Sequence, residues 1–322
     1  MPFRRFLPIL ALAISATLPA AGWAQDYPSK PIRLLVPFGP GSTSDTIARL
    51  IGNGISADLG QPVIIENKPG AGGTIGAAEA ARAAPDGHHL VLGTVASHAI
   101  APFMMQGVRY DPIKDFQPIT VVATAPSVIV VHRTVPASNL KEFIAYVKKH
   151  PDIDYSSAGL GTTAHLAGEA LNSAAGVQMR HVPYKAVGQA ITDLLSGTVK
   201  VMFYQLPSVK PYIASHGLKI VGVTSLKPMP SLPGVAPVSE IYPGYDFSAW
   251  FGMFAPANTP KPIVDRLYKS IMKAIDTPEF KQLMAEQGLE PSGITPDAFQ
   301  SFMKTDVLKW KKATAANAAK LQ

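Results

Sequence analysis

The pattern of apolar and polar residues in the N-terminal third of the chain predicts strands that alternate with helices. Three short apolar runs are typical of buried strands, and they span residues 31–38, 62–67 and 88–94. Between the first two runs, apolar residues recur every four positions, at Ile47, Ile51, Ile55 and Leu59. This spacing predicts a helix that ends at Gly60, and an Ala-rich second helix is predicted over 73–84. The order predicts a parallel sheet covered by helices.

The same order of elements returns in the middle of the chain. Strands are predicted at 154–158, 179–184, 199–205 and 218–225, and helices at 139–150, 163–176 and 188–197. Ser138 is predicted to begin the first of these helices, which carries lysines in its last turn. The C-terminal part is helical over 261–276, 277–288 and 295–310, with Thr295 as the last cap and Pro296 in the first turn.

Two long extended runs, 116–133 and 245–256, flank this middle unit. The first is long enough to cross between two lobes and the second resembles a matching crossing, so both are predicted to be hinge strands, and the C-terminal helices return to the first lobe. We therefore expect an α/β protein of two lobes, each a mainly parallel sheet flanked by helices. Residues 25–125 with 250–322 are expected to form lobe 1, and residues 126–249 lobe 2.

The first 24 residues have the character of an export signal. Two arginines precede the apolar stretch 6–20, and Gly22-Trp23-Ala24 supplies small residues, Gly22 and Ala24, at the expected cleavage positions. The alternative, an uncleaved membrane anchor, is disfavoured because this stretch is short for a membrane span and contains two prolines. The mature chain is expected to begin near Gln25, leaving 298 of 322 residues and no later apolar run of membrane-spanning length.

Charge and cysteine content narrow the function classes. Loss of Arg4 and Arg5 lowers the formal charge from +7 to +5. The densest basic cluster lies on one terminal helix, at Lys304, Lys309, Lys311 and Lys312, and is interpreted as a solvated face, so no nucleic-acid partner is expected. The chain has no cysteine, which excludes disulfides, thiolate catalysis and a lipid-bearing cysteine. An export signal without cysteines indicates the bacterial periplasm.

Glycine and hydroxyl residues dominate the loops that follow the predicted strands. These loops read GPGSTSD, KPGAGGT, GTVASH, SAGLGTT, YKAVGQ and YQLPS. In open parallel sheets a ligand lies beyond the carboxyl ends of the strands, where glycine permits close approach and helix-start amides favour an anion. The hydroxyls of these loops are candidate ligand donors, and each can instead cap a helix, as Ser42 with Asp45 does in a capping box.

Successive segments of the chain together resemble a known family. YPSKPIRLLVPFGPGSTSD, LGQPVIIENKPGAGGTIGA, SSAGLGTTAHLAGE and HVPYKAVGQAITDLLSG are similar, in order, to signature segments of the Bug proteins, periplasmic receptors of the tripartite tricarboxylate transporter family. The resemblance runs from about residue 27 to the C-terminus. It implies a type II periplasmic-binding-protein fold that closes on a small carboxylate, held by backbone amides, hydroxyls and ordered water. It also implies inner-membrane permease subunits as partners.

Carried over to this chain, the resemblance places two gripping turns at 38–45 and 159–165. The candidate ligand-binding residues are Phe38, Gly41, Ser42, Thr43, Asp45, Thr94, His98, Gly161, Thr162, Thr163, Tyr184, Tyr204 and Gln205. Two positions depart from the family pattern: Ser42 stands where glycine is common, and Tyr204 with Gln205 replaces an acidic or small polar residue. A ring and a neutral amide recognise an ammonium group poorly, which favours a carboxylate with an apolar or aromatic body. Tyr204 can equally be a packing residue at the rim.

An exported hydrolase or transferase acting on a carboxylic substrate is the competing function. No G-x-S-x-G elbow occurs, and neither His98 nor His165 has a partner set for catalysis, so no catalytic residue is assigned. A sensory receptor that docks to a signalling protein would have the same sequence pattern, and that alternative stays open.

The sequence motifs give little support for a nucleotide-binding or metal-binding site. GLGTTA at 159–164 matches part of a dinucleotide fingerprint, yet Tyr184 and Lys185 stand where an acidic residue is required. His88 and His89 point to opposite faces of a strand, and no H-E-x-x-H helix occurs, so no metal site is predicted. We therefore expect a monomeric receptor for a di-, tri- or aromatic carboxylate that uses no cofactor.

Overall fold

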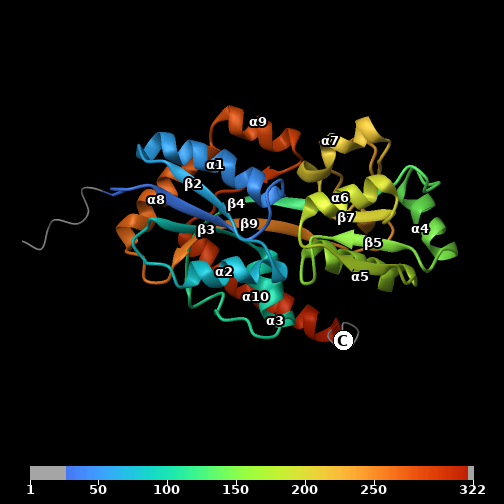
Figure 1. Ribbon diagram of the computed structural model, residues 1–322, viewed down its shortest axis with the longest axis horizontal. Coiled ribbons are helices and arrows are strands. Elements are labelled where there is room, and N and C mark those ends of the chain that lie inside the picture. Colours follow the sequence, from blue (N-terminus) through green and yellow to red (C-terminus); the bar gives the residue numbers. More distant parts are fainter. Residues whose placement is uncertain (1–26, 318–322) are drawn as a thin grey trace, which may run out of the picture.

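The computed structural model describes residues 27–317, which form two α/β lobes placed end to end (Figure 1). The predicted export signal, residues 1–24, lies outside the described part. One strand, β4 (Phe116–Val131), belongs to both lobes. Up to Pro126 it pairs with β9 (Ser248–Pro256), and from Ser127 onward it pairs with β7 (Val201–Gln205) and β8 (Lys219–Val223). A continuous strand therefore joins the two sheets.

Lobe 1 contains a mixed sheet in the order β2-β1-β3-β9-β4. Its parallel strands are β1 (Ile32–Val36), β2 (Val63–Asn67) and β3 (His89–Thr94), and the short β10 (Glu290–Pro291) pairs with β4. The helices of this lobe are α1 (Thr43–Leu59), α2 (Thr74–Ala81), α3 (Ala101–Met104), α8 (Lys261–Ile275), α9 (Pro278–Glu286) and α10 (Pro296–Asn317). Two short turns, η1 (Ala71–Gly73) and the π-helical η2 (Ala96–Ile100), complete it.

Lobe 2 continues the strand order as β4-β7-β5-β6. Here β5 (Asp154–Ser157) lies between β6 (Arg180–Pro183) and β7, all parallel, whereas β4 pairs antiparallel with β7 and β8. Its helices are α4 (Leu140–Lys149), α5 (Thr163–Ala175), α6 (Val187–Ser196), α7 (Leu206–His216) and the short η3 (Val238–Glu240). Among residues 27–317, no helix combines the length and apolar character needed to cross a membrane.

The sheets are mixed rather than mainly parallel because the strands nearest the hinge run antiparallel to their neighbours. The second predicted crossing also differs in detail. β9 begins at Ser248, opposite Pro126, and pairs only within lobe 1. The chain crosses just before it, where the Phe247 amide bonds the Thr224 carbonyl of lobe 2. Only the first crossing is one strand shared by both sheets.

Several predicted helix ends are confirmed and others are corrected: α2 ends at Ala81, before the predicted 84, and α10 continues to Asn317, past the predicted 310. Gly60 ends α1 in the left-handed conformation, with φ of 69°, and Thr295 accepts the Ala298 amide at 3.3 Å. Asn139, not Ser138, caps α4, because its side chain accepts the Glu142 amide while the Glu142 carboxylate accepts the Ser138 amide.

The helix α7 was not predicted between the strands at 199–205 and 218–225. Two of its residues, Pro207 and Pro211, resemble turn signals in the sequence. Pro207 lies in the first turn, where a missing amide proton costs little, but Pro211 lies inside the helix. Helix α7 therefore forms against local propensity, with its buried Val209 packed in the lobe 2 core.

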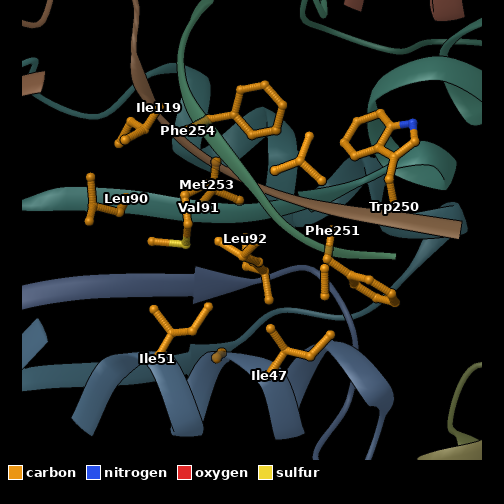
Figure 2. Close-up of a cluster of buried hydrophobic side chains, with 14 of the residues drawn as sticks. Ile47, Ile51, Leu90, Val91, Leu92, Ile119, Trp250, Phe251, Met253 and Phe254 are labelled. Carbon is orange, nitrogen blue, oxygen red and sulfur yellow. The ribbon is translucent and has the colours of Figure 1, made fainter. Parts of the chain in front are cut away.

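Each lobe has its own apolar core. In lobe 1, Ile47 and Ile51 point from α1 toward the sheet (Figure 2), and both are fully buried. Phe254 and Trp250 of β9 belong to the same cluster. Burial of each such side chain contributes about 1.5–3 kcal/mol, so the predicted buried face of α1 anchors its N-terminus against β1.

Two glycines of lobe 2 give a matched test of this packing. Gly168 lies inside α5, and a Cβ there would meet the Tyr155 ring at 2.3 Å, whereas a Cβ on exposed Gly188 of α6 meets nothing within 4 Å. We expect Gly168→Ala to lower the free energy of unfolding by about 1–3 kcal/mol through overpacking. Gly188→Ala should leave it unchanged or raise it by up to about 1 kcal/mol. Urea denaturation measures the free energy of unfolding of both variants. Equal changes in the two would contradict the packing described.

Candidate functional site

A narrow cavity lies between the lobes, at the carboxyl ends of β1, β3, β5 and β7. Its lining residues are Phe38, Thr43, Ser44, Thr94, Val95, Ala96, Ala158, Thr162, Thr163, Ala164, Tyr204, Gln205, Ala249 and Phe251. They come from both lobes and from β9 beside the hinge. The cavity volume is about 30 Å³, and a single water needs roughly 10–15 Å³ on this measure. The space for small molecules between the lobes is therefore narrow in this conformation.

The lobe 1 elbow, residues 37–45, connects β1 to α1. Gly41 adopts φ of 75°, a left-handed conformation that favours glycine. Ser42 then caps α1 by accepting the Asp45 amide at 3.2 Å. The Asp45 carboxylate accepts the Gly41 amide at 3.0 Å, so the reciprocal bond of the predicted capping box goes one residue further back than Ser42.

The lobe 2 elbow, residues 159–165, connects β5 to α5 in the same way. Gly161 has φ of 72°, and the Thr162 hydroxyl accepts the His165 amide at 3.3 Å. That hydroxyl also donates to the Gly159 carbonyl at 2.8 Å. The Gly161 amide donates to His165 Nδ1 at 3.3 Å. Both elbows therefore begin a helix with its N-terminus directed at the cavity.

Each elbow has backbone amides beside the cavity that lack an acceptor within the helix. In α1 and in α5, the side chain of the cap residue accepts the amide of the third helical residue. The amides of the first two helical residues have no acceptor within the helix. Those first two positions are Thr43 and Ser44 in lobe 1 and Thr163 and Ala164 in lobe 2, and all four line the cavity. Their amides and the aligned helix dipoles create a site suited to an anion.

The third wall follows β3. The Thr94 amide donates to Ser97 Oγ at 3.0 Å, and Thr94 Oγ1 accepts the Ser97 amide at 3.3 Å. This turn leads into η2 and holds Thr94, Val95 and Ala96 against the cavity. Across the cleft, the Ser208 hydroxyl of α7 donates to the Gly41 carbonyl at 3.0 Å, which ties lobe 2 to the lobe 1 elbow.

The structure brings many of the sequence-predicted residues together. Those that line the cavity are Phe38, Thr43, Thr94, Thr162, Thr163, Tyr204 and Gln205. Gly41, Ser42, Asp45 and Gly161 lie in the elbows behind the lining, where they shape the backbone instead.

Two predicted residues lie elsewhere. His98 is fully buried in the lobe 1 core, stacked on Phe254 at 4.4 Å between ring centres. Its Nδ1 lies 2.9 Å from Ser97 Oγ, and neither residue lines the cavity. The Tyr184 hydroxyl donates to Asp193 at 2.6 Å, and its ring packs in the core of lobe 2. Tertiary packing that no local pattern encodes accounts for both positions.

Several lining residues were not predicted. Ser44 and Ala164 occupy the second helical position of their elbows, and counting from the predicted caps would have found them. The others are Val95, Ala96, Ala158, Ala249 and Phe251. Small or apolar residues carry no chemical signal in a sequence, and Ala249 and Phe251 reach the cavity only because β9 lies beside β4.

The lining contains no charged side chain. Behind it, burial alone would raise the pKa of Asp45, but hydrogen bonds from Arg49, the Gly41 amide and Asn67 outweigh this and lower the pKa below its usual value. Burial raises the pKa of Tyr204, which keeps its hydroxyl neutral. Among the described residues, no three His, Asp or Glu side chains gather closely enough to hold a metal.

Comparison with known proteins decides the family. The model of the tripartite tricarboxylate transporter family receptor, TctC, matches residues 47–317. This chain belongs to the TctC receptor family. BugT of Bordetella pertussis is 31% identical over the full length of both chains. A protein from the tcbD-tcbE intergenic region of Pseudomonas sp. strain P51 is 34% identical and covers 96% of this chain and 93% of its own.

Solved structures agree with this assignment. Periplasmic binding protein BugD superposes with a TM-score of 0.86 at 37% identity, covering 91% of this TctC receptor and 99% of BugD. Rpa4515 of R. palustris, solved with adipate, gives 0.87 at 31% identity and coverages of 91% and 99%. MatC of Rhodopseudomonas palustris, solved with malate, gives 0.82 at 31% identity and coverages of 89% and 99%. The chain is therefore a periplasmic solute receptor, not an enzyme, as predicted from the resemblance.

The buried histidines of this TctC receptor predict acid sensitivity. Burial lowers the pKa of His98 to about 3 and of His165 to about 4, and burial with nearby His165 lowers that of His181 to about 3. Above the unfolded value of 6.5, both states are neutral. Below it, the unfolded chain takes up protons that the folded chain excludes, so stability falls as pH drops from about 6.5 toward these lowered values.

Each histidine contributes up to about 1.4 kcal/mol per pH unit to the slope of the free energy of unfolding against pH. We expect His98→Phe, which keeps a ring between Phe116 and Phe254, to reduce this slope by about the share of one histidine. Urea unfolding at pH 6.5, 6.0, 5.5 and 5.0 gives the slope whatever the absolute stability of the variant. An unchanged slope would show that His98 titrates normally.

Proposed function

We propose that the interlobe cavity binds a small carboxylate, whose carboxyl group is gripped by the two elbows. The observation that supports this proposal is the convergence of Thr43, Ser44, Thr163 and Ala164, two helix N-termini from opposite lobes, on one uncharged cavity. The side chains of Thr94, Thr163 and Gln205 add polar contacts to the amides. Two relatives were solved with adipate and with malate, both dicarboxylates, which is consistent with this ligand class.

The grip is strong enough without a lysine or arginine. A hydrogen bond to a charged group contributes about 1.5–3 kcal/mol, and a helix N-terminus about 0.3–1 kcal/mol more. Four or five such contacts, less several kcal/mol for lost freedom on association, give about −8 kcal/mol, which corresponds to a micromolar dissociation constant. The missing basic side chain also spares the unliganded site an unpaired buried charge.

The remaining lining favours an apolar or aromatic ligand body. Phe38, Phe251 and Tyr204 line the cavity beside the elbows, and no acidic side chain is present to pair with an ammonium group. An amino acid would bury its ammonium without a charged partner, which is costly. The proposed ligands are therefore di-, tri- or aromatic carboxylates without a free amine.

Ligand capture requires the lobes to open and close about the hinge. We place the hinge where β4 passes from one sheet to the other, at Pro126 and Ser127, and where the chain returns at Phe247. Closure brings Ser208 onto the Gly41 carbonyl and forms the cavity from both lobes. The closed monomer then delivers its ligand to inner-membrane permease subunits, the partners that membership of a tripartite transporter family implies.

A thermal-shift screen of residues 25–322 tests the ligand class. The panel contains adipate, malate, citrate, terephthalate and benzoate, with aspartate and glutamate as the amine-bearing counterparts. A ligand at 100 times its dissociation constant adds about 2.7 kcal/mol of stability. We expect at least one amine-free carboxylate to raise the melting temperature and the amino acids to leave it unchanged. A shift with amino acids alone would contradict the proposal.

A single hydroxyl tests the site. Thr163 is buried at the first position of α5 and lines the cavity, whereas Thr192 is exposed on α6. We expect Thr163→Val to weaken the best carboxylate of the screen about 10- to 100-fold, the equivalent of one hydrogen bond to a charged group. Thr192→Val, the same substitution in the same lobe, should leave affinity unchanged in isothermal titration calorimetry. Equal affinities in both variants would remove Thr163 from the site.

A further inference from the structure

The two elbows repeat one pattern of residues. Gly41-Ser42-Thr43-Ser44-Asp45 and Gly161-Thr162-Thr163-Ala164-His165 each read as glycine, hydroxyl cap, threonine, small residue and hydrogen-bond acceptor. The acceptor occupies the third helical position in both, and its side chain takes the amide of the left-handed glycine, at 3.0 Å for Asp45 and 3.3 Å for His165. The lobes thus reach the same local geometry with different chemistry.

That bond restricts the residue with the greatest conformational freedom in each elbow, its glycine. Glycine populates left- and right-handed conformations with similar ease, so the peptide before the cap can reorient unless its amide is held. The acceptor holds it, and the backbone that follows then directs the first two helical amides at the cavity. Neither Asp45 nor His165 lines the cavity itself.

The two acceptors differ in charge. Asp45 carries a negative charge, which Arg49 offsets through an ion pair at 3.0 Å, and Asn67 donates a hydrogen bond to the carboxylate at 3.1 Å. His165 is 1% exposed and stacks on His181 at 4.1 Å between ring centres. To accept from Gly161 at Nδ1, its ring must be neutral.

We propose that Asp45 and His165 are matched positioning residues, each fixing its elbow by accepting the glycine amide, and that protonation of His165 releases the lobe 2 elbow alone. The inference rests on the proposed function only in taking the elbow amides as the ligand grip. A proton on Nδ1 turns the acceptor into a donor that repels the Gly161 amide. Asp45, by contrast, keeps its acceptor oxygens until a lower pH because its partners stabilise the charged form.

The groups around His165 are consistent with this difference. His181 of β6 stacks on it, and Tyr155 of β5 donates to the His165 carbonyl at 3.1 Å. Glu169 of α5 accepts from the Tyr155 hydroxyl at 2.6 Å, and the Tyr245 hydroxyl donates to the Ala167 carbonyl. None of these side chains forms a hydrogen bond with the His165 ring, and burial lowers the pKa of His165 to about 4.

Amide hydrogen exchange of ¹⁵N-labelled protein without ligand tests the positioning role. We expect His165→Leu to speed exchange at Gly161 at least tenfold and to leave Gly41 unchanged, and Asp45→Leu to do the reverse. His165→Asn and Asp45→Asn, which keep an uncharged acceptor oxygen, should retain protection. His150→Leu, at an exposed histidine of the same lobe, is the control. Unaltered protection at Gly161 in His165→Leu overturns the proposal, and if that variant fails to fold, lost protection in the folded His165→Asn does so.

A pH titration adds a signature that a merely structural role does not produce. Between pH 7 and 3.5, the Gly161 amide shift is expected to move with the His165 ring nitrogen shifts, in one shared transition, while Gly41 stays fixed over that transition. Independent movement of the two signals would contradict the release. Both measurements need no ligand, so they stand whether or not the carboxylate screen succeeds.

The binding consequence is measured with the carboxylate that gives the largest thermal shift. At pH 7, His165→Leu should weaken it at least tenfold and His165→Asn by less than threefold. Full affinity in His165→Leu despite fast Gly161 exchange would show that the lobe 2 elbow is not the grip, a failure of the proposed function rather than of the positioning. A panel without any binder would likewise count against the proposed function alone.

Discussion

The first amides of an α-helix have no acceptor within the helix, and the cleft of this receptor is built on that constraint. Helices α1 and α5 begin where their lobes face the cavity. In each helix the cap residue accepts the amide of the third residue, and the first two residues line the cavity. Other features of the fold support this arrangement. The glycines turn the chain into the helix, the strands hold the turns at one edge, and the shared strand β4 holds the edges face to face.

Local chemistry made much of this site predictable from the sequence. Ser42 and Thr162 are cap residues by type, and glycine precedes each at the position that requires a left-handed backbone. The four-residue spacing of isoleucines places α1 against the sheet. These signals act over a few residues, so one chain segment contains all the information that they need.

What the sequence left unpredicted depends on contacts between distant segments. In the sequence, His98 resembles a polar loop residue. In the structure its ring packs against Phe116 and Phe254, which come from other segments of the chain. Phe251 and Ala249 reach the cavity because β9 pairs with β4. Helix α7 forms despite its prolines since tertiary packing outweighs local propensity.

The uncharged lining of the cavity has a consequence for the medium in which such a receptor works. The periplasm exchanges small ions with the surroundings of the cell, so its ionic strength follows that of fresh water, soil or host fluid. Coulomb attraction between exposed charges is screened within about 10 Å at 0.1 M salt, whereas contacts with buried dipoles act at hydrogen-bond range and are screened far less. The proposed recognition by amide dipoles would therefore hold its strength across salinities that would weaken a receptor relying on surface lysines.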